Sequence, residues 1–279
     1  MNRKEAFSID KRSKTGSEWE TFNFEQLASK IPFDEKPYKV NVLSYLKSLY
    51  IIIVHNSGKI TGTILFVKVL LIDLVFNKPK WDRSKFDISS KAQEVFYKKK
   101  FNENIPVIAF YYALSKKTGK DKADRIIAET MVPVVLEMMK SKYHPVANIE
   151  SVEVWLKQAR NYLGSEIEID KGFEGEIYLA KDKSELRFHV TRCAPMQILR
   201  EYGLIYTATV LCMCDHITYH TIFPNMIFKR THTLAMGDEF CDHEFRVRKN
   251  NEPIMDEDNY SDCARDPEIR QFVKEWEDR

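Results

Sequence analysis

The sequence predicts an α+β fold: a helical N-terminal region followed by a small antiparallel sheet with helices packed on one face. Apolar residues recur at helical spacing through the first half of the chain, most clearly in the segment 120–142. After Gly164 the pattern changes to short alternating segments separated by polar turns, which is typical of strands. The low glycine content, nine in 279 residues, also suits a helix-rich protein.

The composition is that of a soluble globular protein, with 44% apolar and 30% charged residues. The 43 basic and 41 acidic side chains nearly cancel to a formal charge of +2. A nucleic-acid-binding domain would be clearly basic, so no nucleic-acid partner is expected. The N-terminus lacks the apolar core of a secretory signal, and five cysteines in such a chain favour free thiols in a cytoplasmic, reducing location.

Four regions are expected along the chain. Residues 1–22 are polar and unpatterned and predict a loose N-terminal arm. A helical region spans 23–165, and an α+β region rich in Cys, His and Asp, expected to carry the function, spans 166–250. The last region, 251–279, is an acidic tail with a short terminal helix over 267–277.

Breaks rich in Pro, Gly and Asn divide the helical region into separate helices. Ser89 or Ser90 caps one of them, Pro106 lies in the first turn of the next, and Pro133 predicts a kink in the long helix that follows. The expected helices cover 23–30, 38–54, 60–76, 91–101, 106–118, 120–142 and 149–163.

The segment 60–76 is the most apolar part of the chain. It contains Lys68 and Asp73, whereas a membrane span needs about 20 apolar residues and loses about 2.5–3.5 kcal/mol for a central charge. The pattern therefore argues against a transmembrane span and favours a buried or interfacial helix. It leaves open contact with a membrane surface or with a second copy of the chain in a homo-oligomer.

Two strands, two helices and a hairpin are expected after Gly164. Lys181–Ser184 is the polar turn between the first two strands, Gly203 caps the first helix, and residues 236–238 turn the hairpin. The strands cover 173–180, 185–191, 226–234 and 239–247, and the helices cover 195–202 and 204–220.

The segment 186–247 gathers four of the five cysteines and five of the seven histidines. On its second helix, Cys212, His216 and His220 are four residues apart and share one stripe, which Asp215 borders. Core-forming sequence does not normally gather thiols, imidazoles and carboxylates in this way. The segment is therefore the first place to look for chemistry.

A metal site is one interpretation of this pattern. A His-x-x-x-His pair on one helix face can bind zinc, and His216, His220 and Cys241 are the candidate ligands. His243, two residues after Cys241 and on the same strand face, is a further donor. Because no tight Cys-x-x-Cys pair accompanies them, free buried thiols and hydrogen-bonded histidines are favoured and no cofactor is expected.

Two arginines of the same segment are candidate anion-binding groups. Strand alternation over 226–234 puts Arg230 on one face with His232 and apolar neighbours, where an arginine pairs with a carboxylate or an anion. Arg192 is the second cation. The arginines, with three acidic residues of the segment, predict a site for a small anionic molecule. The acidic residues are Asp215, Asp238 and Asp242.

Five short motifs follow one another in this segment. They are Thr191-Arg192-Cys193, Cys212 to His216, Arg230-Thr231-His232-Thr233-Leu234, Gly237-Asp238 and Cys241-Asp242. Their order resembles the L-2-amino-thiazoline-4-carboxylic acid hydrolase family of bacterial proteins. In that family a Thr-Arg-Cys strand end precedes a helix with Cys and Asp, and Arg-Thr-x-Thr-Leu, Gly-Asp and Cys-Asp-Phe follow. This chain departs at His243, which stands in place of the usual aromatic residue.

The resemblance implies hydrolysis of a cyclic isothiourea. Water adds to the carbon between the ring nitrogen and the ring sulfur, the sulfur leaves as a thiolate, and the product is N-carbamoyl-cysteine. Such a reaction needs a base, a proton donor and a cation for the substrate carboxylate. The expected function is therefore that of a hydrolase acting on a small carboxylated heterocycle.

The resemblance and the clustering assign candidate roles for acid–base catalysis. Asp215 or Asp242 is the base, Arg230 or Arg192 anchors the substrate carboxylate, and His216 donates a proton.

Covalent catalysis is the alternative mechanism. Cys212 or Cys241 would be the nucleophile, activated by His216 or His243. The other residues of the motifs are assigned to substrate binding: Thr231, Thr233, Asp238 and His243.

Two other classes of function remain open. Thiols beside histidine and arginine can be deprotonated and oxidised easily, which would suit a non-catalytic small-molecule-binding or thiol-based redox-sensing domain. A metal-binding module is the third class.

Overall fold

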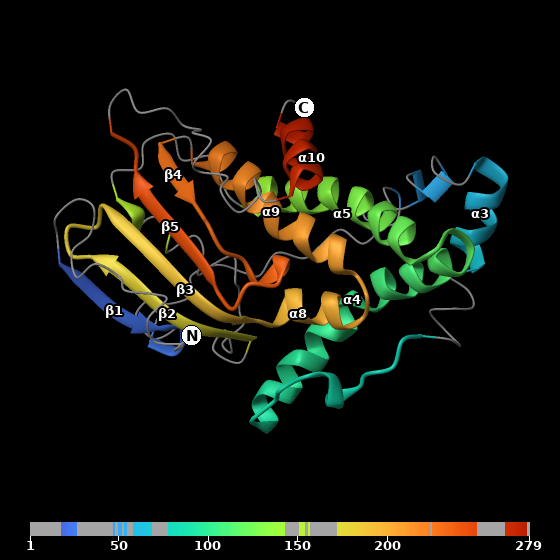
Figure 1. Cartoon of the computed structure of the whole chain (residues 1–279), viewed down its shortest axis with the longest axis horizontal. Helices are drawn as coiled ribbons and strands as arrows, with labels where there is room; N and C mark the ends of the chain where they lie inside the picture. Colours follow the sequence, from blue (N-terminus) through green and yellow to red (C-terminus); the bar gives the residue numbers. More distant parts are fainter. Residues whose placement is uncertain are drawn as a thin grey trace.

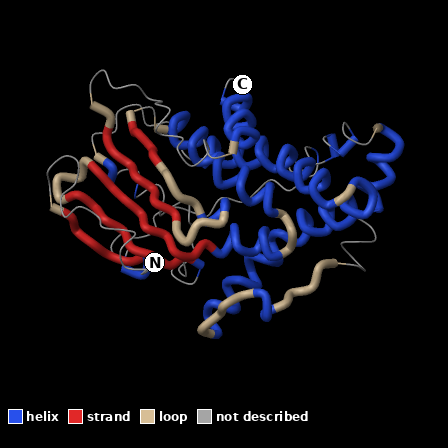
Figure 2. The backbone as a smooth tube through the Cα atoms, in the orientation of Figure 1, coloured by secondary structure: helices blue, strands red, loops and turns tan. Residues whose placement is uncertain are grey.

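The computed structural model describes residues 18–26, 47, 50–51, 53–54, 58–68, 78–142, 151–153, 156, 172–223, 225–249 and 266–277. Over these residues the fold is α+β, as predicted, with a sheet on one side and helices on the other (Figures 1 and 2). Most of the expected helices 23–30, 38–54 and 149–163, and residues 69–76, lie outside the described residues.

One antiparallel sheet of five strands has the order β1-β2-β3-β5-β4. Alternation along β5 sends every second side chain to the helical side, where the core lies. The strands are β1 (Trp19–Asn23), β2 (Phe173–Ala180), β3 (Glu185–Cys193), β4 (Met226–Lys229) and β5 (Cys241–Val247).

Strand β1 corrects the expected loose arm over residues 1–22. Trp19–Asn23 pairs with β2 at the edge of the sheet, and Phe22 is buried opposite Ile177. A five-residue strand with few inward apolar side chains leaves little periodicity to detect, which is why the sequence did not predict it.

The helices that build the other layer are longer or shorter than the sequence pattern indicated. They are α3 (Lys59–Lys68), α4 (Lys91–Thr118), α5 (Lys120–Lys142), α8 (Ala194–Glu201), α9 (Ile205–Ile222) and α10 (Pro267–Glu277), with short 3₁₀ turns η2 (Arg83–Lys85) and η3 (Leu234–Met236). The long helix 120–142 and the terminal helix 267–277 are confirmed with their expected bounds.

Helix α4 is continuous where two helices were expected. Pro106 lies inside it, so this proline does not begin a new helix. A buried face runs along both halves of α4, from Phe96 and Phe101 to Phe110 and Leu114, and this packing outweighs the local cost of the proline. Ser90, one of the two expected caps, accepts the amide of Gln93.

The hairpin of the functional half also differs from the expected one. β4 ends at Lys229 instead of continuing to residue 234, and the segment that follows leaves the sheet. The reason lies in two carboxylates further along the chain: Asp242 accepts the backbone amides of Thr231 and His232 at 2.8 and 2.6 Å, and Asp238 accepts that of Thr233 at 2.6 Å. These carboxylates give the backbone an alternative to ladder pairing.

Helix α3 is the described part of the helix over 60–76 that was expected to be buried or interfacial, and its exposed side chains favour the interfacial interpretation. Ile60 and Ile64 are 78% and 60% exposed. Among the described residues, the helices are too short or too polar for any to cross a membrane.

Candidate functional site

The site begins on the inward face of β5. Cys241 pairs with Val190 and His243 with Phe188, both core residues of β3, so Cys241 and His243 face the helices. The expectation that these two share a strand face is confirmed. Asp242 lies between them and points to the other face of the sheet.

Arg230 is the centre of a cluster of side chains that is called the Arg230 cluster below; its other members are Cys212, Asp215, Thr233, Cys241 and His243. The side chain of Arg230 is fully buried, and Nη1 donates to Asp215 Oδ2 at 3.0 Å and lies 3.3 Å from Cys212 Sγ and from His243 Nε2. Nη2 donates to the carbonyl oxygen of Cys212 at 3.0 Å. A buried guanidinium is stable only when its donors are paired in this way. Three chemically different side chains therefore meet at one nitrogen atom.

The contact with Arg230 suits one tautomer of His243. A guanidinium has donors and no acceptor, so in a hydrogen bond between the two side chains His243 Nε2 accepts and the ring proton is on Nδ1. Asp215 Oδ2 lies 4.0 Å from the same Nε2. An acceptor nitrogen that faces a carboxylate and a thiol is a candidate proton carrier.

Thr233 joins the two thiols of the cluster. Its buried hydroxyl lies 3.3 Å from Cys212 Sγ and 3.6 Å from Cys241 Sγ, and the backbone amide of Leu234 donates to Cys241 Sγ at 3.2 Å. Burial raises the pKa of the Cys212 thiol to about 12, although the neighbouring Arg230 acts in the opposite direction. The Cys212 thiol is therefore protonated at neutral pH.

The other described thiols behave in the same way. All are free, and burial raises the pKa of each one above its usual value; they are Cys193, Cys214 and Cys241. A buried, protonated thiol reacts slowly with oxidants and electrophiles.

The accessible part of the cluster consists of a carboxylate, an imidazole and the half-buried thiol of Cys212. Asp215 keeps 25% and His243 15% of its side-chain surface exposed, whereas Arg230 keeps none. A ligand arriving from solvent therefore meets Asp215 and His243 before the arginine.

Four other predicted site residues lie elsewhere. Arg192 pairs with Glu174 of the neighbouring strand β2, and Asp242 holds the loop after β4 through the amides of Thr231 and His232. His216 is fully buried against Phe228, with ring centroids 4.8 Å apart. The fourth, Asp238, caps the amide of Thr233.

The remaining predicted residues give a mixed result. Thr231 donates its hydroxyl hydrogen to Asp242. It therefore helps to hold the loop after β4 and is not part of the cluster around Arg230. The side chain of His220, a candidate metal ligand, lies outside the described residues. Within the part of the chain that is described, no group of three or more His, Cys, Asp and Glu side chains is arranged to hold a metal ion.

Asp124 on α5 is a residue that the sequence did not indicate. Its buried carboxylate accepts the amides of Tyr206 and Thr207 at 2.7 and 2.9 Å and the Thr207 hydroxyl at 2.6 Å. These are the first amides of α9, so Asp124 anchors the helix that carries Cys212 and Asp215. An acceptor about eighty positions upstream leaves no local sequence signal.

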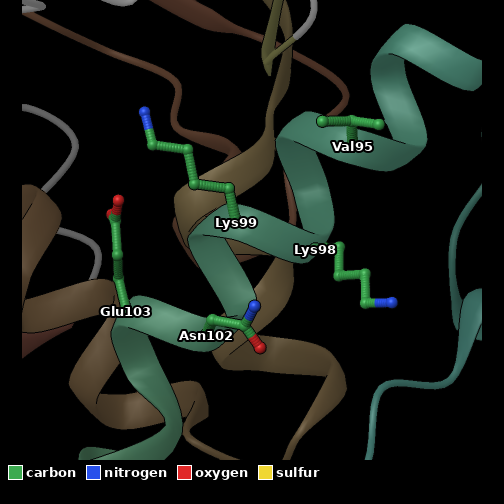
Figure 3. A pocket seen from close by; sticks show the side chains of 5 residues that line it. All are labelled: Val95, Lys98, Lys99, Asn102 and Glu103. Atoms are coloured by element: carbon green, nitrogen blue, oxygen red, sulfur yellow. The ribbon is translucent and has the colours of Figure 1, made fainter.

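A surface hollow lies away from this cluster, along one side of α4 (Figure 3). All five lining residues come from that helix, and they are Val95, Lys98, Lys99, Asn102 and Glu103. None of them is a thiol, an imidazole or a member of the Arg230 cluster, so the hollow does not replace the cluster as the candidate site.

The comparison with family models supports the resemblance. The model described as L-2-amino-thiazoline-4-carboxylic acid hydrolase matches residues 98–245, just over half of the chain, from the first half of α4 to β5. The matched range includes Cys212, Asp215 and Arg230. No curated protein and no solved structure matches the chain. The chain belongs to the L-2-amino-thiazoline-4-carboxylic acid hydrolase family.

Proposed function

We propose that this protein is a hydrolase that opens the carbon–sulfur bond of a small carboxylated cyclic isothiourea, such as L-2-amino-thiazoline-4-carboxylate. The product is N-carbamoyl-cysteine. The observation that carries the proposal is the meeting of Cys212, Asp215 and His243 at one nitrogen of buried Arg230. The family name points to the same reaction.

Asp215 is the proposed substrate-binding carboxylate. The isothiourea carbon carries two nitrogen atoms. When this planar group is protonated, a carboxylate pairs well with it. Asp215 is partly exposed and is held in place by Arg230 at 3.0 Å. Binding in its cationic form makes the carbon between nitrogen and sulfur more electrophilic.

Arg230 is proposed as a positioning residue and not as the anchor for the substrate carboxylate. Its side chain has no exposed surface, and its donors already serve Asp215, Cys212 and His243. Arg192, the other candidate anchor, is already paired with Glu174 of β2. The bound molecule is therefore selected first by its isothiourea group.

His243 is the proposed proton carrier of this chain; the family pattern has an aromatic residue at this position, so the role is proposed for this protein and not for the family. Because a carboxylate paired with a guanidinium is a weak base, we assign the proton of the attacking water to His243 Nε2, whose single lone pair must first give up the contact with Arg230 Nη1. The hydroxide adds to the isothiourea carbon, the tetrahedral intermediate expels the ring sulfur as a thiolate, and the imidazolium returns the proton to that sulfur. One water is consumed, a urea and a thiol are formed, and the proton that the cationic substrate carried is released from the protonated urea to solvent.

Cys212 is the alternative reacting group. It lies beside the same guanidinium, but its raised pKa leaves little thiolate to attack the substrate before a base removes the proton. Direct attack by water avoids this step and is therefore preferred. Cys212→Ala decides between the routes, because water attack survives the loss of the thiol and covalent catalysis does not.

The thiol-sensor function is less well supported. Burial raises the pKa of the described thiols, and redox-sensing cysteines are typically accessible and low in pKa. The enzyme proposal uses the same residues without requiring a reactive resting thiolate.

The test is turnover of L-2-amino-thiazoline-4-carboxylate by purified protein, with N-carbamoyl-cysteine detected by mass spectrometry. The reaction is run with and without a chelator. Product formation that the chelator does not change supports hydrolysis by the side chains named here. Loss of product only when the chelator is present would show that the reaction needs a metal ion. Absence of product in both conditions refutes the proposed substrate.

A further inference from the structure

Among the described residues, Gly62 and Phe66 of helix α3 pack against the rest of the protein from one side of the helix. Gly62 lies against the preceding segment so closely that a Cβ there would come within 2.7 Å of Val54 Cα. Phe66 packs on Phe110 of α4 and on Tyr50, with ring centroids 5.7 and 5.3 Å apart. Gly62 and Phe66 therefore define the inner side of the helix.

The opposite side of α3 is an exposed apolar ridge formed by Ile60, Ile64 and Val67. These residues are spaced by four and three positions, so they form one stripe, and they are 78%, 60% and 44% exposed. Ile51, in the neighbouring segment, is 53% exposed as well. Single exposed aliphatic residues are common, but a continuous ridge marks an interaction surface.

Basic residues stand at both ends of the ridge. Lys59 begins α3 and Lys68 ends it, both are exposed, and the sequence of the helix contains no Asp or Glu. Figure 1 shows α3 at the end of the molecule farthest from the sheet, where a flat partner can reach it. An apolar ridge between two cations complements a lipid surface, in which anionic headgroups lie over apolar acyl chains.

We propose that the outer side of α3 binds the surface of a membrane that contains anionic lipids. Ile60, Ile64 and Val67 would enter the boundary between headgroups and acyl chains, while Lys59 and Lys68 meet the anionic headgroups. The helix has only 10 described residues and lies on the membrane without crossing it.

A second copy of the chain fits this ridge less well. A two-fold contact along α3 brings Lys59 of one copy to Lys59 or Lys68 of the other, so like charges meet in either orientation. Stable protein interfaces also engage roughly 20–30 residues on each side, far more than this ridge supplies. A lipid surface brings no like charge to the lysines and does not need as many contacting residues.

The experiment is co-sedimentation of the full chain with lipid vesicles. Vesicles of neutral phosphatidylcholine are compared with vesicles that also contain anionic phosphatidylglycerol. The test variant is Ile60→Ser with Ile64→Ser, both on the outer side, and a second variant, Lys59→Gln with Lys68→Gln, removes the charges. Thermal unfolding checks that each variant folds.

Val95→Ser is the matched control. Val95 is 52% exposed on α4, and Figure 3 shows it with Lys98, Lys99, Asn102 and Glu103, so it is an isolated aliphatic side chain beside lysines. The same substitution there removes exposed apolar surface without touching α3.

The expected result is sedimentation with anionic vesicles that falls at least about tenfold in the double-isoleucine variant, falls in the lysine variant and at high salt, and is unchanged in Val95→Ser. No sedimentation, or equal loss in Val95→Ser, overturns the proposal. A dimer in light scattering that Ile60→Ser with Ile64→Ser converts to monomer, without vesicle binding, overturns it in favour of self-association.

Discussion

At the scale of single residues, Arg230 determines how the site is built. It is the largest fully buried side chain among the described residues, and it holds a carboxylate, a thiol and an imidazole that come from α9 and β5. If β4 had continued through Arg230, strand alternation would have placed its side chain on the same face as Phe228, toward the core of the sheet. Because the chain leaves β4 at Lys229, the guanidinium turns toward Asp215 instead.

Arg230→Met should strongly destabilise the protein. The substitution leaves Asp215 and the carbonyl of Cys212 without their donor, and removal of one partner of a buried charge pair costs about 3–5 kcal/mol. Denaturant unfolding at neutral pH measures the loss, with Arg200→Met as an arginine control outside the cluster. A loss below about 1 kcal/mol, typical of exposed pairs, would show that Arg230 does not organise the site.

His243→Phe should lower kcat/KM by about 10²–10⁴-fold, the usual contribution of a positioned base. The wild-type rate should fall at acid pH as the imidazole becomes protonated, and this dependence should disappear in the variant. Phenylalanine keeps the stacking on Phe228 and restores the aromatic residue of the family pattern, so the fold is retained. A variant with full activity and an unchanged pH–rate profile would move the base role to another group.

The four described thiols should react slowly with a thiol-specific reagent in the native protein. Burial raises the pKa of each, so the thiolate that reacts is scarce until the pH is high. The linked effect on stability has a definite sign: a thiol whose pKa is raised by folding stabilises below its unfolded pKa and loses this contribution as the pH rises. Rapid labelling near neutral pH would restore the redox-sensor interpretation.

At the scale of the elements, long and regular patterns were predicted well. The sequence gives the bounds of α5 and β2 as observed, because each has a clear period and a definite stop signal. Pro106 was misinterpreted because buried packing along α4 outweighs a local break. β4 was too long because Asp242, far along the chain, captures the amides that would have continued it.

The candidate site was predicted only in part for the same reason. Cys212 and Asp215 were placed on one helix side, and Cys241 and His243 on one strand face, by local periodicity. Their meeting at Arg230 depends on contacts between α9, the loop after β4 and β5, which no local pattern contains. His216 was given a role through its spacing alone, yet it lies in the core against Phe228.

Asp124→Ala should destabilise α9 by about 0.5–2 kcal/mol, the usual cost of losing a cap. The variant should also change how stability depends on pH. Burial raises the pKa of Asp124, so the native state retains its proton more readily, and wild-type stability contributed by this group is lost as pH rises through the raised pKa. Unfolding curves from acid to neutral pH should show this decrease in the wild type and not in Asp124→Ala.

At the scale of the whole molecule, the two proposed surfaces are separate. The Arg230 cluster lies where α9 meets the sheet, whereas α3 stands at the opposite end of the molecule (Figure 1). The family match begins at residue 98, after α3, so it covers the cluster and leaves α3 out. Recognition of a small molecule and attachment to a surface can therefore be altered independently.

Ile60→Ser with Ile64→Ser should leave kcat/KM for the thiazoline unchanged within experimental error. The two side chains point to solvent on a helix that contributes nothing to the cluster. Steady-state assays without lipid measure this. A lowered kcat/KM in a folded variant would show that α3 and the site are coupled.

The most direct test of the proposed enzyme is the yield of N-carbamoyl-cysteine from L-2-amino-thiazoline-4-carboxylate with wild type and Asp215→Asn side by side. Asparagine keeps an oxygen for Arg230 and removes only the charge that pairs with the isothiourea group. We expect turnover by the wild type and a loss of at least about 100-fold in kcat/KM for the folded variant. Equal turnover by both proteins, or no turnover by the wild type, would contradict the assignment.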